Sequence, residues 1–279
     1  MIKRPYQLTL LIATIMLLLV SQLVIAKEEK STKEFPGRDL YPEVKFIELQ
    51  DFYKKLNRNE VVVVDVRSSY EYQTLRIKDA INIPLASKTF VSEMRKLRVA
   101  DNRPIIVYCN GKTCMKSYKA ARKCDIEKID DVYSYDAGIM DFAKTYPKYA
   151  LLLGKVLNDP KKLISKDDFK KHLIEPEKFG ERIASTSDIV LDVRDRFQRE
   201  GISIFVGREH RVSIDNTRRL DRYIDKAIKE NKTILIYDAA GKQVRWLQYY
   251  LNDKGLKSYY FMKGGIRAYY KNMKSDFKI

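Results

Sequence analysis

Four short runs of consecutive apolar residues stand out along the chain. All are rich in Val and Ile: "VVVVDV" from Val61, "PIIVY" from Pro104, "DIVLDV" from Asp188 and "TILIY" from Thr233. Strands buried on both faces of a parallel sheet have this pattern, because both sets of alternating side chains contact apolar neighbours. The runs therefore predict buried parallel strands.

Segments with helical spacing of their apolar residues lie between these runs. They are "FIELQDFYKKL", "KSYKAARKC", "LDRYIDKAIKE" and "VRWLQYYLNDKG". Strands that alternate with helices of this length favour βαβ units and an α/β fold.

The chain also repeats itself. "VVVVDVRSSYEYQ" corresponds to "DIVLDVRDRFQRE", "RPIIVYCNGK" to "KTILIYDAAGK", and "SYDAGIMDFAKTYP" to "YFMKGGIRAYYKNM". The separations are 127, 129 and 127 positions for Asp65 and Asp192, Cys109 and Asp238, and Gly138 and Gly265. Three features in near-constant register indicate two copies of one domain. We expect domain 1 at 35–147, a linker at 148–162 and domain 2 at 163–279.

The N-terminus has the layout of a secretory signal over residues 1–26. A basic "MIKR" precedes the apolar "LTLLIATIMLLLV", and "SQLVIA" ends in a small residue at Ala26. The alternative is an uncleaved anchor, since this segment is nearly long enough to span a bilayer. Either form predicts export, most simply to the periplasm, with membrane contact only if the segment stays attached.

Composition narrows the class of protein. The 279 residues are 45% hydrophobic and 33% charged, as expected of a folded protein with a core. The formal net charge of +17 is compatible with nucleic acid, anionic membranes or small anionic substrates. The basic residues are spread without a dense block, so no nucleic-acid partner is expected.

Three cysteines are present, Cys109, Cys114 and Cys124. An odd number in an exported chain leaves at least one thiol without an intrachain partner. His172 and His210 are distant in sequence and there is no Cys-x-x-Cys pair, so neither a zinc site nor a cofactor is expected. Cys124 lies in a helical pattern and is expected to pack in the core.

Cys109 directly follows the apolar run "IIVY", at the end of a predicted strand. Ligands of open α/β sheets bind beyond the carboxyl ends of the strands. The loop "NGKTC" must turn there, with Gly111 supplying backbone freedom, before a helix begins near Met115. Amide N–H groups of such a loop form an anion cradle. We therefore expect a lowered pKa for the Cys109 thiol, strengthened by Lys112 and Lys116.

Two other anion loops fail on a required residue. A phosphate-binding P-loop needs a glycine where Ile106 stands. A cysteine-dependent phosphatase needs an arginine where Met115 stands, to grip phosphate with two hydrogen bonds.

Over roughly Phe35 to Lys274 the chain resembles tandem rhodanese-domain proteins of the thiosulfate sulfurtransferase kind. The matching elements are "DVRSSYEY…IKDAINIP", "VYCNGKTCMKSYKAA" and "DAGIMDF", and in the second copy "LDVRDRF" and "MKGGIRAYY". The resemblance implies two domains, each a mainly parallel sheet flanked by helices.

The resemblance also implies a two-step mechanism. Cys109 would attack the outer sulfur of a small anionic donor such as thiosulfate, release sulfite and hold a persulfide, which a thiol or cyanide then takes. The cradle positions would be Asn110, Gly111, Lys112, Thr113 and Cys114.

The chain departs from the family in its second copy. In familiar two-domain rhodaneses the catalytic cysteine lies in the C-terminal copy, where this chain has Asp238. We expect Asp238 to satisfy amides at a helix start, in a loop longer than the first, and to leave the second copy structural. Asp65 and Arg67 are expected to form an internal ion pair where the first strand ends, as are Asp192 and Arg194 in the second copy.

Two other functions stay open at this point. A thiol–disulfide oxidoreductase would use Cys109 and Cys114, and a non-catalytic module would use the same scaffold for recognition.

Overall fold

The structure is a computed structural model that describes residues 34–194 and 204–276. The predicted signal segment, residues 1–26, lies outside the described residues. Among the helices of the described part, none is long and apolar enough to cross a membrane.

The described residues form two compact units. The first holds 34–68 and 77–146, and the second holds 69–76, 147–194 and 204–276. Residues 69–76, which the sequence places in the first repeat, thus belong to the second unit. They contain α4 (Ser69–Thr74) and the start of β2 (Leu75–Ile77).

The segment expected to link the copies, residues 148–162, is part of the second unit. Its elements are short: η1 (Pro147–Tyr149), β6 (Ala150–Leu152), β7 (Lys155–Val156) and η2 (Pro160–Lys162). β2, β6 and β7 form a small sheet in that order.

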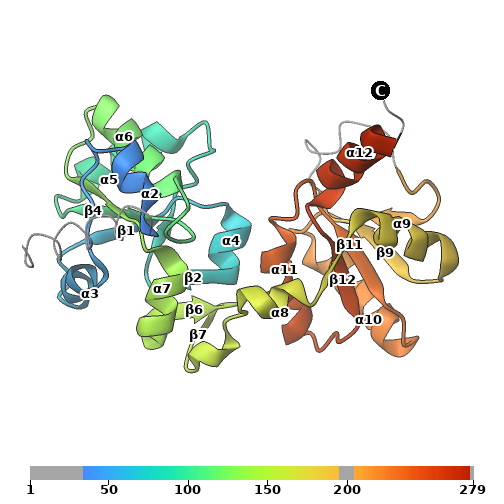
Figure 1. Ribbon diagram of the computed structural model, residues 1–279. Helices are drawn as coiled ribbons and strands as arrows, with labels where there is room; N and C mark the ends of the chain where they lie inside the picture. The colour runs from blue at the N-terminus through green and yellow to red at the C-terminus, as the bar shows by residue number, and fades with distance from the viewer. Residues whose placement is uncertain (1–33, 195–203, 277–279) are drawn as a thin grey trace, which may run out of the picture. The chain divides into compact units, whose positions relative to one another are not determined.

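The first unit is built on a parallel sheet with the strand order β3-β1-β4-β5, of which β1 and β4 are labelled in Figure 1. Its strands are β1 (Val62–Asp65), β3 (Ile81–Asn82), β4 (Ile105–Tyr108) and β5 (Val132–Tyr135). Its helices are α2 (Pro36–Leu40), α3 (Leu49–Asn57), α5 (Phe90–Ala100), α6 (Lys116–Ile126) and α7 (Gly138–Thr145).

The second unit repeats this sheet and adds one strand, in the order β10-β9-β11-β12-β8 (Figure 1). Its strands are β8 (Leu173–Ile174), β9 (Ile189–Asp192), β10 (Glu209–Arg211), β11 (Ile234–Tyr237) and β12 (Tyr259–Met262). Its helices are α8 (Lys166–Lys170), α9 (Pro176–Ser185), α10 (Thr217–Lys229), α11 (Val244–Asp253) and α12 (Gly265–Asp276).

Every residue of β1, β4, β9 and β11 is buried, as their uniform apolar runs predict. Alternate residues pack on opposite sides: Ile189 and Leu191 lie in a cluster with α10 and α11, whereas Val190 packs with α9 and α12. The predicted α/β fold of two domains, each a mainly parallel sheet flanked by helices, is confirmed.

Candidate active site at the Cys109 loop

Cys109 follows β4 directly, at the carboxyl end of the first sheet, and α6 begins seven residues later at Lys116. Its side chain lies in the same core cluster as Val107, two residues earlier on the strand. Cys109 is 0% exposed. The strand period of two therefore directs this thiol toward the helices that cover the sheet and away from solvent.

The Cys109 thiol makes short contacts with the loop and with α6. Its Sγ lies 3.1 Å from the carbonyl oxygen of Cys114, to which it donates, and 3.6 Å from the Oγ of Ser117. Burial raises the pKa of Cys109 well above its ordinary value, and the hydrogen bond to Cys114 raises it further. The expected lowered pKa at Cys109 is therefore wrong for this conformation.

The thiolate of this loop is instead on Cys114, which is partly exposed. Its pKa falls to about 6, chiefly because the Cys109 thiol donates a hydrogen bond to its sulfur. The backbone N–H groups of Lys116 and Asn110 also donate to that sulfur, and the Lys116 charge lowers the pKa further. The cradle thus holds one sulfur anion near neutral pH, as the loop pattern predicts, but on the other cysteine.

A buried ion pair fixes the start of the loop. Arg67 donates from Nε and Nη2 to the Asp65 carboxylate, at 2.9 and 2.6 Å, and both side chains are 0% exposed. Arg67 also donates from Nη1 to the Oδ1 of Asn110, at 3.0 Å. The predicted internal ion pair is confirmed, and the structure adds that its Arg67 holds the side chain of Asn110, the residue after Cys109.

The remaining predicted loop residues have different roles. Gly111 does not adopt a positive φ, so the expected need for its backbone freedom is wrong. Lys112 pairs with Glu34 and with Asp141, the latter at 3.1 Å, so carboxylates engage its charge. Thr113 is exposed.

The start of α7 supports the loop from behind. The N–H groups of Ile139 and Met140 donate to the carbonyls of Cys109 and Asn110, at 3.0 and 3.5 Å. Gly138 has φ +69°, and a Cβ there would lie 2.4 Å from the backbone nitrogen of Gly111. Our sequence reasoning missed Gly138 and Ser117 as site residues. The recurrence of Gly138 as Gly265 was the available signal for the first.

The corresponding loop of the second domain is filled by a carboxylate. Asp238 is 1% exposed and accepts hydrogen bonds from backbone N–H groups. The donors are Ala240, Gly241, Gln243 and Val244. The expectation that Asp238 satisfies amides at a helix start is confirmed.

The two loops differ by one residue in the opposite sense to our expectation. α11 begins six residues after Asp238, whereas α6 begins seven after Cys109. In the second loop Gly241 adopts a φ of +70°, in the left-handed region that glycine tolerates best. Gly265, with φ +62°, lies against this loop as Gly138 does against the first.

Other predicted residues of the second domain and the core are now placed. Arg194 pairs with Asp192 at 2.7 Å, as expected. His172 stacks on Tyr259 and His210 on Tyr223. Cys124 is 1% exposed in the core of the first domain, which confirms its packing role. Within the described ranges, no group of three or more His, Cys, Asp and Glu side chains is placed to hold a metal ion.

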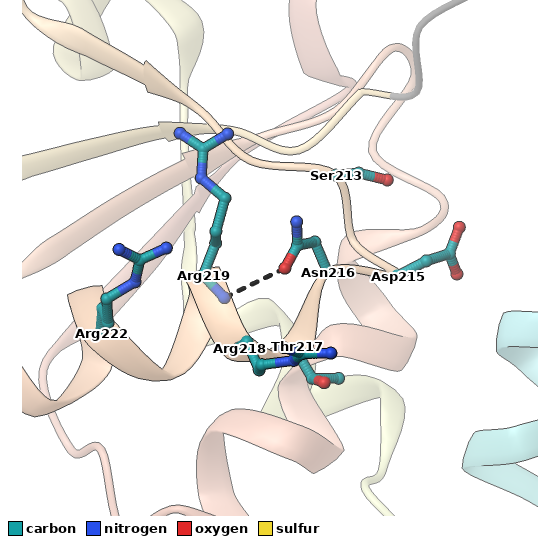
Figure 2. Close-up of a pocket in the computed structure, with 7 residues that line it drawn as sticks. All are labelled: Ser213, Asp215, Asn216, Thr217, Arg218, Arg219 and Arg222. Carbon is teal, nitrogen blue, oxygen red and sulfur yellow. Dashed lines mark hydrogen bonds between the residues drawn. The ribbon is translucent and has the colours of Figure 1, made fainter.

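A cavity of about 640 Å³ opens beside the start of α10, in the second domain (Figure 2). Its lining is rich in arginine and contains no thiol: Ser213, Asp215, Asn216, Thr217, Arg218, Arg219 and Arg222. The Asn216 side chain accepts from the Arg219 backbone N–H and caps the helix (Figure 2).

Comparison with known proteins gives one family. The rhodanese-like domain family matches the chain twice, over residues 48–145 and 175–272. A tRNA uridine(34) hydroxylase of Cytophaga hutchinsonii is 31% identical over 99 residues, which cover 35% of this chain and 31% of the relative. One from Pelagibacter ubique is 31% identical over 111 residues, covering 40% and 36%. The chain thus spans about a third of these curated relatives.

Among solved structures, the chain is similar to a thiosulfate sulfurtransferase from Pseudomonas aeruginosa. The sequence identity is 18%, the TM-score is 0.39, and the match covers 82% of this chain and 43% of that one.

Proposed function

The chain belongs to the rhodanese-like domain family, and from that premise we propose that it is a sulfurtransferase. It moves sulfane sulfur from thiosulfate or a related small anion to a thiol or cyanide, through a persulfide on Cys109. The observation that carries the proposal is the loop after β4, which begins with Cys109 at the strand end and places its sulfur 3.1 Å from the carbonyl oxygen of Cys114 and 3.6 Å from the Oγ of Ser117. Ligands of parallel sheets bind at such strand ends.

Cys109 is the proposed carrier because it occupies the first loop position, directly after the strand. Ser117, at the start of α6, offers its N–H and hydroxyl to a charged sulfur on Cys109, and both lower the pKa of that thiol. Cys114 acts as the base: its thiolate accepts the hydrogen bond of the Cys109 thiol and takes the proton.

The reaction then balances in two steps. The Cys109 thiolate bonds to the outer sulfur of thiosulfate, the S–S bond of the donor breaks, and sulfite leaves with the electron pair. The acceptor thiolate or cyanide next attacks the terminal sulfur of the persulfide, and Cys109 leaves as the thiolate. Because Cys109 is 0% exposed, residues 110–114 must open before the donor reaches it.

The second domain is proposed to be structural. Its cradle amides are taken by Asp238, which is covalently fixed and cannot carry sulfane sulfur. The named hydroxylases lend no second proposal, since the chain spans only about a third of their length. Export to the periplasm stays a prediction from residues 1–26.

One further function is favoured by a specific contact. The Sγ of Cys109 lies 3.1 Å from the carbonyl oxygen of Cys114, so the two cysteines are neighbours, and a thiol–disulfide redox protein that never carries extra sulfur is the second candidate.

Sulfur loading separates the candidates. The purified, reduced protein is incubated with thiosulfate or a polysulfide, and the mass of each cysteine peptide is measured. We expect one added sulfur on Cys109 at the earliest time points of loading, and its accumulation there in Cys114→Ser. Cys109→Ser should lower sulfur transfer by on the order of 10³-fold or more, the scale seen when an enzyme loses its nucleophile. Cys114→Ser should keep a measurable rate.

Equal loss in both variants, with no added sulfur on Cys109 of the wild type or of Cys114→Ser at any time point, would favour the redox protein. A chain that gains no sulfur and forms no disulfide would be a binding module.

A further inference from the structure

The two cysteines of the first loop are neighbours, but the transfer reaction proposed above needs a persulfide on only one of them. Cys109 Sγ lies 3.1 Å from the carbonyl oxygen of Cys114, and Cys114 packs against the core cluster that holds Cys109. Cys114 is partly exposed, whereas Cys109 is buried. A base for Cys109 need not be a second sulfur nucleophile, yet this chain has a second cysteine whose backbone carbonyl lies 3.1 Å from the Cys109 sulfur.

The Cys114 sulfur is also placed and ionised for attack. Amide N–H groups of Asn110 and Lys116 donate to it, and Lys116 adds a positive charge. A thiolate is the nucleophile in thiol–disulfide exchange, and it acts best when its pKa lies near the ambient pH. The pKa of about 6 at Cys114 satisfies this condition.

We propose that Cys114 is a resolving thiol, which attacks the Cys109 sulfur of the persulfide, closes a Cys109–Cys114 disulfide and releases the terminal sulfur as hydrosulfide. The inference rests on the proposed function, because it requires a persulfide on Cys109. Disulfide formation is then a second way to release the sulfur, in which no external acceptor takes part in the release step.

The electrons and protons balance as follows. The Cys114 proton taken up during loading passes to the terminal sulfur of the persulfide. The Cys114 thiolate then forms the new S–S bond, the old S–S bond breaks, and hydrosulfide leaves with its electron pair. The disulfide is reopened by two equivalents of a reduced thiol, which is oxidised to its own disulfide.

The release can be measured without an added acceptor. Reduced full-length protein is freed of small thiols, incubated with thiosulfate, and the hydrosulfide is trapped with a fluorescent alkylating bimane. We expect the wild type to release up to one hydrosulfide per chain and then stop, with a disulfide between the Cys109 and Cys114 peptides. Dithiothreitol should restart the release.

Variants assign the roles. Cys114→Ser and Cys114→Ala should release no hydrosulfide and should retain one added sulfur on Cys109 until cyanide removes it. Agreement between the Ser and Ala variants at position 114 argues against a local folding defect. Removal of the added sulfur by cyanide shows that the loop still carries and transfers sulfur. Cys124→Ser, in the core away from the loop, should behave as the wild type.

Three results would overturn the inference. A wild-type protein that keeps its added sulfur without releasing hydrosulfide would exclude a resolving role, as would added sulfur found on Cys114, which indicates a relay. If neither the wild type nor Cys114→Ser gains sulfur on Cys109, the proposed function fails and this inference fails with it.

Discussion

The two domains use one loop-and-helix device and fill it with different anions. In the second domain the anion is the strand-end residue itself, Asp238, whose carboxylate takes the amides of the loop and of the start of α11. In the first domain the strand-end residue is Cys109, and the anion comes from Cys114, further along the same loop.

The difference shows that the same fold can hold either a permanent structural anion or an ionisable thiol at the equivalent loop. A buried carboxylate held by several N–H groups is a permanent part of the structure, because removing it leaves those groups unsatisfied. A thiolate near neutral pH gains and loses its charge under ordinary conditions, and sulfur bonds to it reversibly. Equivalent backbone amides therefore hold a permanent anion in the second domain and an ionisable thiol in the first.

The largest expected effect comes from removing the carboxylate of the second domain. Asp238→Ala should lower the free energy of unfolding of that domain by about 3 kcal/mol, because buried amides lose a charged acceptor. Trp246 is the chain's single tryptophan and lies buried on α11, so its fluorescence in urea reports this domain. Sulfur transfer per folded molecule should not change.

Asp253→Ala is the matched control, since Asp253 is exposed at the end of the same helix. Equal stability of Asp238→Ala and the wild type would mean that the carboxylate does not hold the second loop.

The next effect compares the two supporting glycines. Gly138→Ala brings a Cβ to 2.4 Å from the Gly111 nitrogen, at a φ of +69°. We expect it to displace the Cys109 loop and lower transfer roughly 10-fold, with a loss of about 2 kcal/mol in stability.

Gly265→Ala is the same change in the second domain, where the Cβ would lie 2.6 Å from the Ala240 nitrogen. It should lower the stability reported by Trp246 and leave transfer by the folded protein unchanged. Transfer assays on both variants, with urea unfolding beside them, test this. An equal loss of transfer in the two would contradict the assignment of the chemistry to the first loop.

The fold was predictable because burial on both faces leaves a simple mark in the sequence. "IIVY" became β4, Ile105–Tyr108, since each of its residues must be apolar whichever face it occupies. The buried strand runs recur in both copies of the repeat, so the loop that follows each of them could also be located. The exchange of residues 69–76 into the second unit was not predictable, because helix α4 has its partners at distant positions of the chain.

The position of the candidate site could be predicted from the sequence, but the ionisation of its two thiols could not. That a cysteine follows a strand end is visible in the sequence, whereas the pKa of each thiol depends on which sulfur faces amides and which faces the core. The parity of Cys109 with Val107 was a usable sign that its thiol points inward. The glycine that the loop requires also depends on contacts formed only in the fold. A Cβ on Gly138, not one on Gly111, would lie too close to another backbone segment.

A third test titrates the anion of the first loop. Thiolates are the form that iodoacetamide alkylates, so the rate at Cys114 should rise about 10-fold between roughly pH 5 and 7, the range that brackets its pKa of about 6. Cys124, whose pKa burial raises to about 12, is the internal control and should stay unmodified.

Cys109→Ala should move the Cys114 midpoint to higher pH, because it removes the hydrogen bond that chiefly lowers that pKa. Mass spectrometry of the alkylated peptides resolves each site. In the wild type, a Cys114 midpoint near the ordinary thiol value of about 8.5 would show that the Cys109 thiol does not lower the pKa of Cys114.

The smallest effect concerns a contact that the second domain cannot make. Arg67 donates to the Asn110 side chain, whereas the corresponding loop position, Ala239, has no polar side chain. Asn110→Ala therefore gives the first loop the residue of the second. It removes one hydrogen bond from a buried charged donor, which is worth about 1.5–3 kcal/mol. The Asp65 carboxylate still holds Arg67 at 2.6 Å, so we expect the lower end of that range.

A loop held less firmly should open more often. We expect Cys109, 0% exposed in the closed loop, to be alkylated a few-fold faster in Asn110→Ala, while transfer changes by about 3-fold or less. The sign of the change in transfer identifies the slow step. Faster transfer means that opening of the loop limits the rate. Slower transfer means that the slow step takes place in the closed loop. Unchanged alkylation of Cys109 would show that the Arg67 contact does not restrain the loop, and that the two domains differ only in the anion they hold.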